Sequence, residues 1–131
     1  MIGKKSKRVA IGLIVNDDDK VLMGKRNDTD KWTTPCGHIE VGECPFLGMA
    51  RELKEEAGLD AKEIKLVKVG MQDDMLLYLF KICVDKDQKV DCSGDPDKEC
   101  DDFTYEDPFD HVEKLHVPAD KNWVLKHWAN S

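Results

Sequence analysis

The chain has 131 residues, a net charge of −7 and an apolar fraction of 40%, which suits one domain with a single core over residues 1–131. No run approaches the roughly 18 continuous apolar residues of a membrane span, and the negative charge disfavours a basic groove for nucleic acid. Five cysteines without paired short spacing argue against a disulfide framework or a zinc site, and the N-terminus lacks a secretory cleavage site, so we expect reduced thiols in a cytoplasmic protein.

The first part of the chain predicts a β-hairpin. Val9–Val15 is an apolar run of strand length, residues 16–19 form a polar turn, and Val21 begins a second strand that ends near Lys25 and Arg26. The further expected elements are a loop at 27–31, a helix at 45–57, strands at 64–69 and 75–84, a loop at 85–99, a short strand at 103–105, a short helix near 109–115 and a terminal helix from Pro118. This order indicates an α+β or mixed three-layer domain.

The central helix has residues that suit its two ends. Pro45 can occupy the first turn without losing a hydrogen bond, and Gly58 suits the left-handed position just beyond the last turn. One side of the helix carries an apolar stripe made by Phe46, Ala50, Leu53 and Ala57. Because these residues recur at helical spacing, we expect the stripe to face the core.

The same helix carries three carboxylates that fall on one side. Glu55 and Glu56 follow Glu52 by three and four positions, so their side chains can converge. Like charges at this spacing weaken an isolated helix by a few tenths (~0.2–0.5) of a kcal/mol per pair, and the run is otherwise typical of a solvated face. A hard divalent cation is the simplest group that would favour such convergence, because Mg²⁺ prefers carboxylate oxygens and substrate phosphates.

These carboxylates belong to a longer pattern between Gly37 and Leu59. It reads Gly37, five residues, Glu43, seven residues, and then Arg-Glu-Leu-Lys-Glu-Glu-Ala-Gly-Leu from Arg51 to Leu59. The segment resembles the Nudix box, with all nine specified positions filled over 23 residues, and the chain is similar to MutT-like Nudix hydrolases. The resemblance implies an α/β/α sandwich whose mixed β-sheet presents the box as a loop-helix-loop, which agrees with the α+β order of elements.

The resemblance also implies the roles of the box residues. Glu52 and Glu56 are expected to bind Mg²⁺, or Mn²⁺ in its place, and Glu55 is expected to be a further ligand or the base that orients water. The backbone carbonyl of Cys36 is expected to complete the metal site. Arg51 and Glu43 complete the expected catalytic set, as a buried pair that holds the box loops.

Position 36 is where the chain departs from its relatives, which usually have Pro-Gly-Gly where this chain has Pro35-Cys36-Gly37. A carbonyl ligand does not depend on the side chain, so we expect activity to be retained. If the position needs a positive φ, a cysteine there costs about 1–2 kcal/mol of strain. A nucleophilic role for Cys36 is the alternative, although no covalent step is needed.

Several residues outside the helix are candidates for substrate binding. Lys25 and Arg26 could meet phosphates, with a solvated strand end as the equal alternative, and Trp32 could stack on a base or pack against the sheet. His38 resembles the histidine of some Pro-Gly-Gly-His boxes, with a surface-loop histidine as the alternative. By the same resemblance, the acidic segment at 95–99 offers Asp97 or Glu99 as an additional metal ligand.

The resemblance implies hydrolysis of a nucleoside diphosphate linked to another group. The expected substrate is a small nucleotide, most readily a nucleoside triphosphate, ordinary or modified, converted to its monophosphate and pyrophosphate. ADP-ribose, a dinucleotide or a nucleotide sugar is the alternative substrate, and a non-catalytic nucleotide-binding domain is the alternative from another class. Both a monomer and a homodimer remain compatible with the sequence.

Overall fold

The larger of two sheets combines strands from before and after the central helix. In a computed structural model, which describes residues 7–94, 102–115 and 125–129, its strand order is β4-β1-β6-β5. The strands are β1 (Arg8–Ile14), β4 (Cys36–His38), β5 (Glu63–Gln72) and β6 (Met75–Cys83). β1 runs parallel to β6, whereas β4 and β5 are antiparallel to their neighbours. The sheet is therefore mixed, and its edge strand β4 leads into the box.

The smaller sheet has the order β3-β2-β7. Its strands are β2 (Val21–Lys25), β3 (Trp32–Thr33) and β7 (Thr104–Glu106). The predicted hairpin of the first two strands is wrong, because β1 and β2 lie in different sheets and share only the isolated bridge between Val15 and Val21. Both edges of β1 are already paired, with β4 on one side and β6 on the other.

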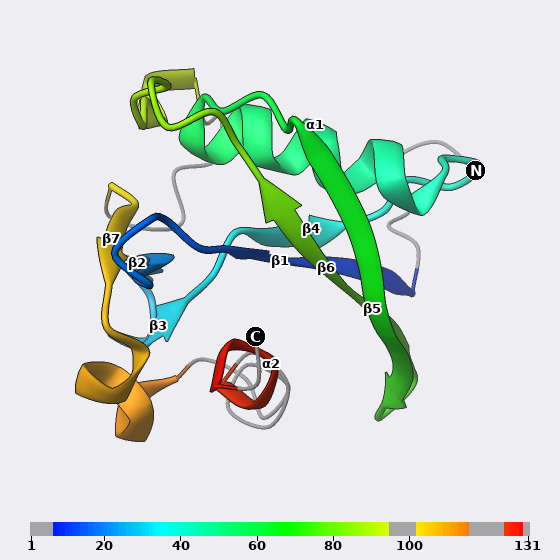
Figure 1. Ribbon diagram of the computed structural model, residues 1–131. Helices are drawn as coiled ribbons and strands as arrows, with labels where there is room; N and C mark the ends of the chain where they lie inside the picture. The colour runs from blue at the N-terminus through cyan, green and yellow to red at the C-terminus, as the bar shows by residue number, and fades with distance from the viewer. Residues whose placement is uncertain (1–6, 95–101, 116–124, 130–131) are drawn as a thin grey trace.

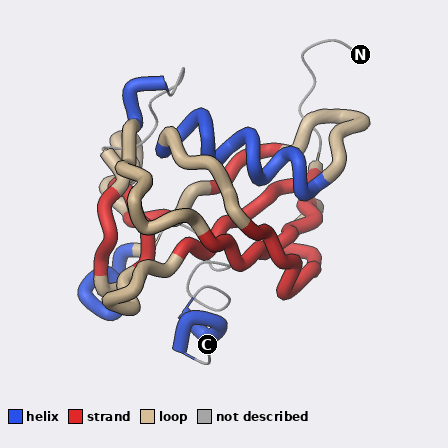
Figure 2. Tube along the Cα trace, turned by 45° about the horizontal axis from the view of Figure 1, so that its top comes forward, coloured by secondary structure: helices blue, strands red, loops and turns tan. Residues whose placement is uncertain are grey.

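Helices lie on both sides of the larger sheet. Figure 1 shows α1 (Pro45–Ala57) across one face and α2 (Leu125–Ala129) on the opposite side, and the turned view of Figure 2 agrees. Two 3₁₀ helices, η1 (Cys92–Gly94) and η2 (Pro108–Lys114), complete the described elements. None of the helices in the described ranges is long and apolar enough to cross a membrane. The fold is the expected α+β arrangement, although the predicted start of the terminal helix, Pro118, lies outside the described residues.

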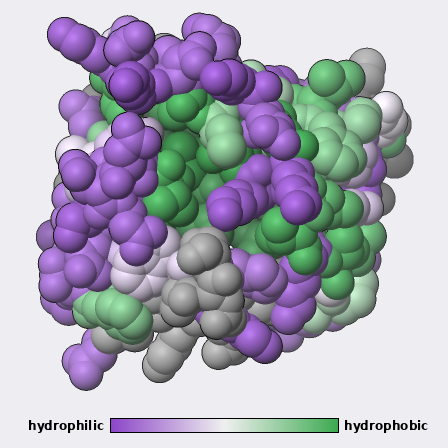
Figure 3. Space-filling model, viewed as in Figure 1, coloured by the Kyte–Doolittle hydropathy of each residue, from purple (hydrophilic) through white to green (hydrophobic). Residues whose placement is uncertain are grey.

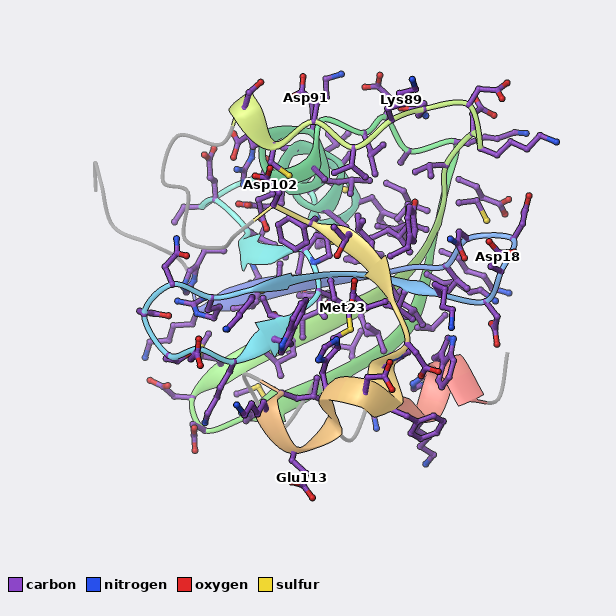
Figure 4. The ribbon with its side chains drawn as sticks, turned by 90° about the vertical axis from the view of Figure 1, so that its left-hand side faces the viewer. Asp18, Met23, Lys89, Asp91, Asp102 and Glu113 are labelled. Atoms are coloured by element: carbon purple, nitrogen blue, oxygen red, sulfur yellow. The ribbon has the colours of Figure 1, made fainter. Side chains whose placement is uncertain are left out.

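Alternate residues of β1 enter two separate core clusters. Ala10 and Ile14 pack in the cluster that contains Leu53 of α1. Ile11 and Leu13 pack in the other cluster, together with buried Met23 of β2 and with Trp128 of α2 at its margin. Because successive side chains of a strand point to opposite faces, a sheet covered on both faces needs an almost continuous apolar strand. Figure 4 shows Met23 inside the molecule, whereas Glu113 of η2 points away from it.

The apolar stripe predicted for α1 is only half right. Leu53 and Ala57 are fully buried, but Ala50 is half-buried and Phe46 remains 41% exposed. Met49, which the stripe omitted, is buried in their place. The inner side of the helix therefore follows a row of residues four apart, from Met49 to Leu53 to Ala57.

Candidate active site

α1 holds three carboxylates on the side that faces β4 and solvent. The helix begins at Pro45 and ends at Ala57, as predicted. Gly58 follows with a φ of 68°, and its N–H donates to the carbonyl oxygen of Lys54 at 3.0 Å. This left-handed position is inexpensive for glycine, so the helix stops immediately after Glu55 and Glu56.

Glu52 lies directly against the backbone of β4. A Cβ atom at Gly37 would overlap the Glu52 carboxylate, so only glycine leaves that group its place. Burial raises the pKa of Glu52, while hydrogen bonding to Glu56 and the positive charge of Arg51 act in the opposite direction. A partly desolvated carboxylate therefore sits beside the main chain of the box.

Glu56 approaches the same strand one residue earlier. The backbone N–H of Cys36 donates to Oε1 of Glu56 at 3.4 Å. Cys36 itself is in β4 and is not among the three described non-glycine residues with positive φ, so the strain considered for this position does not arise. Its Sγ lies 3.8 Å from the hydroxyl oxygen of Thr33.

The guanidinium of Arg51 connects the loops on either side of the helix. Nε and Nη2 donate to the two carboxylate oxygens of Glu43 at 2.9 and 3.0 Å, and Nη2 also donates to the carbonyl oxygen of His38 at 3.2 Å. Nη1 donates to Glu52 at 3.0 Å and to Glu55 at 3.3 Å. Hydrogen bonds from Arg51 lower the pKa of Glu43, and the same contact raises the pKa of Arg51. Arg51 thus fixes the positions of three carboxylates at once.

The two cations at the end of β2 lie in ion pairs with their own loop. Nζ of Lys25 is 2.8 Å from Asp30, and the Arg26 guanidinium donates to both oxygens of Asp28 at 2.9 and 2.8 Å. The Arg26 hydrogen bond holds the pKa of Asp28 at about 2, well below its ordinary value. A phosphate group would have to compete with these aspartates for both cations.

Trp32 packs against a histidine from the far end of the described chain. Its ring stacks on that of His111 at a centroid distance of 3.8 Å and an interplanar angle of 20°. Nε2 of His111 is in turn 3.0 Å from Oε1 of Glu106, and this hydrogen bond lowers the pKa of Glu106. The stack joins β3, η2 and β7 at one side of the smaller sheet.

Asp97 and Glu99 lie outside the described residues, but the stretches that flank them are anchored near α1. The N–H of Asp91 donates to the carbonyl oxygen of Ala57 at 2.8 Å, and the N–H of Phe103 contacts Sγ of Cys92 at 3.3 Å. Figure 4 shows Asp91 and Asp102 near the end of α1.

The NUDIX domain family matches this chain over residues 6–127. The chain belongs to the NUDIX family. Curated relatives named RNA pyrophosphohydrolase include one from Legionella pneumophila, 38% identical over 68 residues, which is 51% of this chain and 39% of that protein. Another, from Francisella tularensis, is 29% identical over 97 residues, or 68% of this chain and 63% of that protein. The matches thus span less than two-thirds of either relative.

Solved structures with the same fold include two whose names state a nucleotide-related activity or family. The Escherichia coli dihydroneopterin triphosphate pyrophosphohydrolase superposes with a TM-score of 0.79 at 16% identity, over 97% of this chain and 98% of that one. A MutT from a study of Aliivibrio salmonicida and Vibrio cholerae has a TM-score of 0.73 at 20% identity, over 93% and 95% of the two chains. At these identities the likeness establishes the Nudix fold alone.

The chemistry of the Nudix box suits a divalent cation. Its potential donors are carboxylate oxygens, the type that Mg²⁺ prefers, and the space they occupy beside β4 is one that a Cβ at Gly37 would fill. Within the described ranges, however, no three His, Cys, Asp or Glu residues are gathered in a metal-binding arrangement. Arg51 contacts Glu52 and Glu55, so binding a cation there requires these side chains to rearrange.

Three residues that support the candidate site residues were not singled out from the sequence. Arg8 donates to carbonyl oxygens of the loop before α1, while His111 and Glu106 support Trp32. Arg8 looks like one more member of a basic N-terminal run, and residues about 80 positions apart give no local pattern that would pair Trp32 with His111. Only the tertiary fold brings these groups together.

Proposed function

We propose that this Nudix protein is a Mg²⁺-dependent pyrophosphohydrolase that converts a nucleoside triphosphate, ordinary or modified, to its monophosphate and pyrophosphate. The observation that carries the proposal is the approach of Glu52 and Glu56 to the backbone of Cys36 and Gly37 within a complete box. Hydrolysis adds one water across one phosphoanhydride bond and needs no covalent intermediate with the thiol of Cys36.

In this proposal each box residue has a distinct task. Glu52 and Glu56 hold the cation together with the carbonyl oxygen of Cys36. When bound, Mg²⁺ neutralises phosphate oxygens and makes the attacking water easier to deprotonate. Glu55, whose side chain is 40% exposed, is accessible to solvent and orients or deprotonates that water. Arg51, held by Glu43, keeps Glu52 and Glu55 aligned.

The phosphates and the base of the substrate have candidate partners outside α1. Arg26 and Lys25 would bind phosphate oxygens by leaving Asp28 and Asp30, and His38 lies on β4 beside the box. Figure 3 shows an apolar hollow bordered by hydrophilic side chains, which suits the flat, weakly polar face of a base. We propose that Trp32 binds the base as part of its stack with His111 rather than as an isolated ring.

The second candidate substrate is the triphosphorylated 5′ end of an RNA. It is favoured by the two curated relatives, both of which are named RNA pyrophosphohydrolase. The bond broken and the pyrophosphate released are the same in both cases. The net charge of −7 favours the smaller substrate, because an RNA chain brings further phosphates that an acidic surface repels. None of the four described cysteines is in a disulfide, which is compatible with a cytoplasmic enzyme.

A substrate panel with identified products tests the proposal. It should contain ordinary and oxidised nucleoside triphosphates, 5′-triphosphorylated RNA, ADP-ribose, dinucleotides and nucleotide sugars, each with Mg²⁺, and the variant E56Q should serve as the inactive control. Monophosphate and pyrophosphate from a free triphosphate support the first choice, whereas pyrophosphate from RNA alone supports the second. AMP and ribose phosphate from ADP-ribose as the main products would contradict both, and an E56Q variant as active as the wild type would refute the role of the box.

A further inference from the structure

Arg8 forms hydrogen bonds to the loop that precedes α1 with both its backbone and its side chain. Nη2 of Arg8 donates to the carbonyl oxygens of Glu40 and Glu43 at 3.0 and 3.1 Å. The carbonyl oxygen of Arg8 accepts the N–H of Ile39 at 2.9 Å. One residue at the start of β1 therefore contacts the loop at both its beginning and its end.

The loop held in this way is a tight turn whose first residue, Ile39, is buried in the core. The N–H of Glu43 donates to the carbonyl oxygen of Glu40 at 3.0 Å, and the N–H of Glu40 returns a bond to the Glu43 carboxylate at 3.0 Å. Gly42, between them, has a φ of 81°, and Val41 is exposed. Without Arg8, two loop carbonyls would lose their cationic donor and would turn to water.

Glu43, at the end of this loop, is the residue that holds the Arg51 guanidinium, which in turn contacts Glu52 and Glu55. A shift of Glu43 would therefore move Arg51 and, with it, two carboxylates on α1. Arg8 also places a second positive charge near Glu43, which contributes to the lowered pKa of that carboxyl group.

We propose that Arg8 is a positioning residue for the Nudix box: it fixes residues 39–43 so that Glu43 can hold Arg51 and align Glu52 and Glu55 for hydrolysis. This inference rests on the function proposed above for its kinetic consequence, but the order it assigns to the loop can be measured without any substrate. Arg8 acts through other residues and need not touch the substrate.

The geometry of the Arg8 guanidinium allows a variant to separate loop positioning from simple attraction of phosphates. A single terminal nitrogen carries the two N–H groups that reach both carbonyls. A lysine ends one bond earlier and has a compact ammonium group, so R8K keeps the charge but loses part of the reach. If Arg8 instead acted by attracting substrate phosphates, R8K would largely restore function.

Lys7 provides a matched control. Its Nζ is 3.3 Å from Asp74, and both side chains are 75% exposed, away from the box. K7Q removes the same charge from the adjacent residue but leaves the loop contacts in place. Differences in activity or exchange between R8Q and K7Q therefore report the loss of the Arg8 hydrogen bonds to the loop and not the change in net charge.

The experiment compares wild type, R8Q, R8K and K7Q by steady-state hydrolysis and by amide hydrogen exchange of residues 39–43. We expect R8Q to lower kcat by about 10- to 100-fold with KM within about threefold of wild type. Exchange at the Glu43 N–H should become about tenfold faster in R8Q, intermediate in R8K and unchanged in K7Q. Thermal unfolding of each variant confirms that the chain remains folded.

A higher KM at unchanged kcat in R8Q, with restoration by R8K, would overturn the proposal in favour of direct phosphate binding. Unchanged exchange at Glu43 in R8Q would also overturn it. If the wild type hydrolyses no nucleotide, the proposed function fails. Faster exchange in R8Q would then still support the role of the Arg8 hydrogen bonds in ordering the loop.

Discussion

Replacing Gly37 by alanine adds one methyl group at the point where β4 and α1 meet. The new Cβ would lie within the space of the Glu52 carboxylate, far inside the ordinary contact distance of 3.4–4 Å. Glu52 would have to retreat by about 1 Å, and a misplacement of that size at a reacting centre can reduce the rate by about 100-fold. We therefore expect G37A to lose about 100-fold in kcat, with overpacking lowering the free energy of unfolding by about 1–3 kcal/mol.

Gly42, in the same box, offers a control that separates crowding from backbone strain. No atom lies within 4 Å of a Cβ at this position, but its φ of 81° belongs to the left-handed region. G42A should therefore cost about 1–2 kcal/mol of stability through backbone strain, without touching Glu52. The assay is steady-state hydrolysis together with urea unfolding of both variants. Wild-type kcat in G37A would refute the steric account of Gly37.

Two further predictions concern stability and pH. L53A removes a fully buried side chain from the core beneath the box and should lower the free energy of unfolding by about 2–5 kcal/mol. L47A, at a position 65% exposed, should change the free energy of unfolding by less than about 0.5 kcal/mol. Comparable losses of the two variants in urea unfolding would contradict the assignment of Leu53 to the buried side of α1. R26Q should return the pKa of Asp28 from about 2 towards its ordinary value of 3.8, because it removes the Arg26 hydrogen bond. Since that pKa is lowered in the folded protein, the ion pair stabilises the fold above the ordinary pKa and ceases to do so as the pH falls towards 2. An NMR titration of Asp28 that is the same in R26Q and wild type would contradict this explanation.

Local signals in the sequence were sufficient for the box helix and for several strands. Pro45 and Gly58 predicted both ends of α1 correctly, because each suits a backbone position that few other residues occupy at so low a cost. The strands β5, β6 and β7 were also predicted, from apolar runs and from alternation. β3 and β4 were not, since they have two and three residues and flank Pro35, which makes their sequence read as a loop.

The wrong predictions share a physical cause, which is that pairing between distant segments overrides local patterns. The turn at 16–19 is compatible with a hairpin, but β1 pairs with β6, about 70 residues away, and β2 joins another sheet. Phe46 has the right spacing for the core, yet it remains 41% exposed while its ring meets Phe80 of β6 edge-on at 5.1 Å. Likewise, the carboxylates could be predicted from the box. The closeness of Glu52 to Gly37 and the hydrogen bonds from Arg8 to the loop could not, because they depend on how β4 pairs with β1.

The most direct test of the central claim is binding of Mn²⁺, as a paramagnetic substitute for Mg²⁺, followed by electron paramagnetic resonance without substrate. Wild type should bind the ion, E52Q and E56Q should bind it at least about tenfold more weakly, and E63Q, which neutralises an exposed glutamate of β5, should bind like the wild type. Equal affinity of all four proteins would contradict the assignment of the cation to the carboxylates of α1.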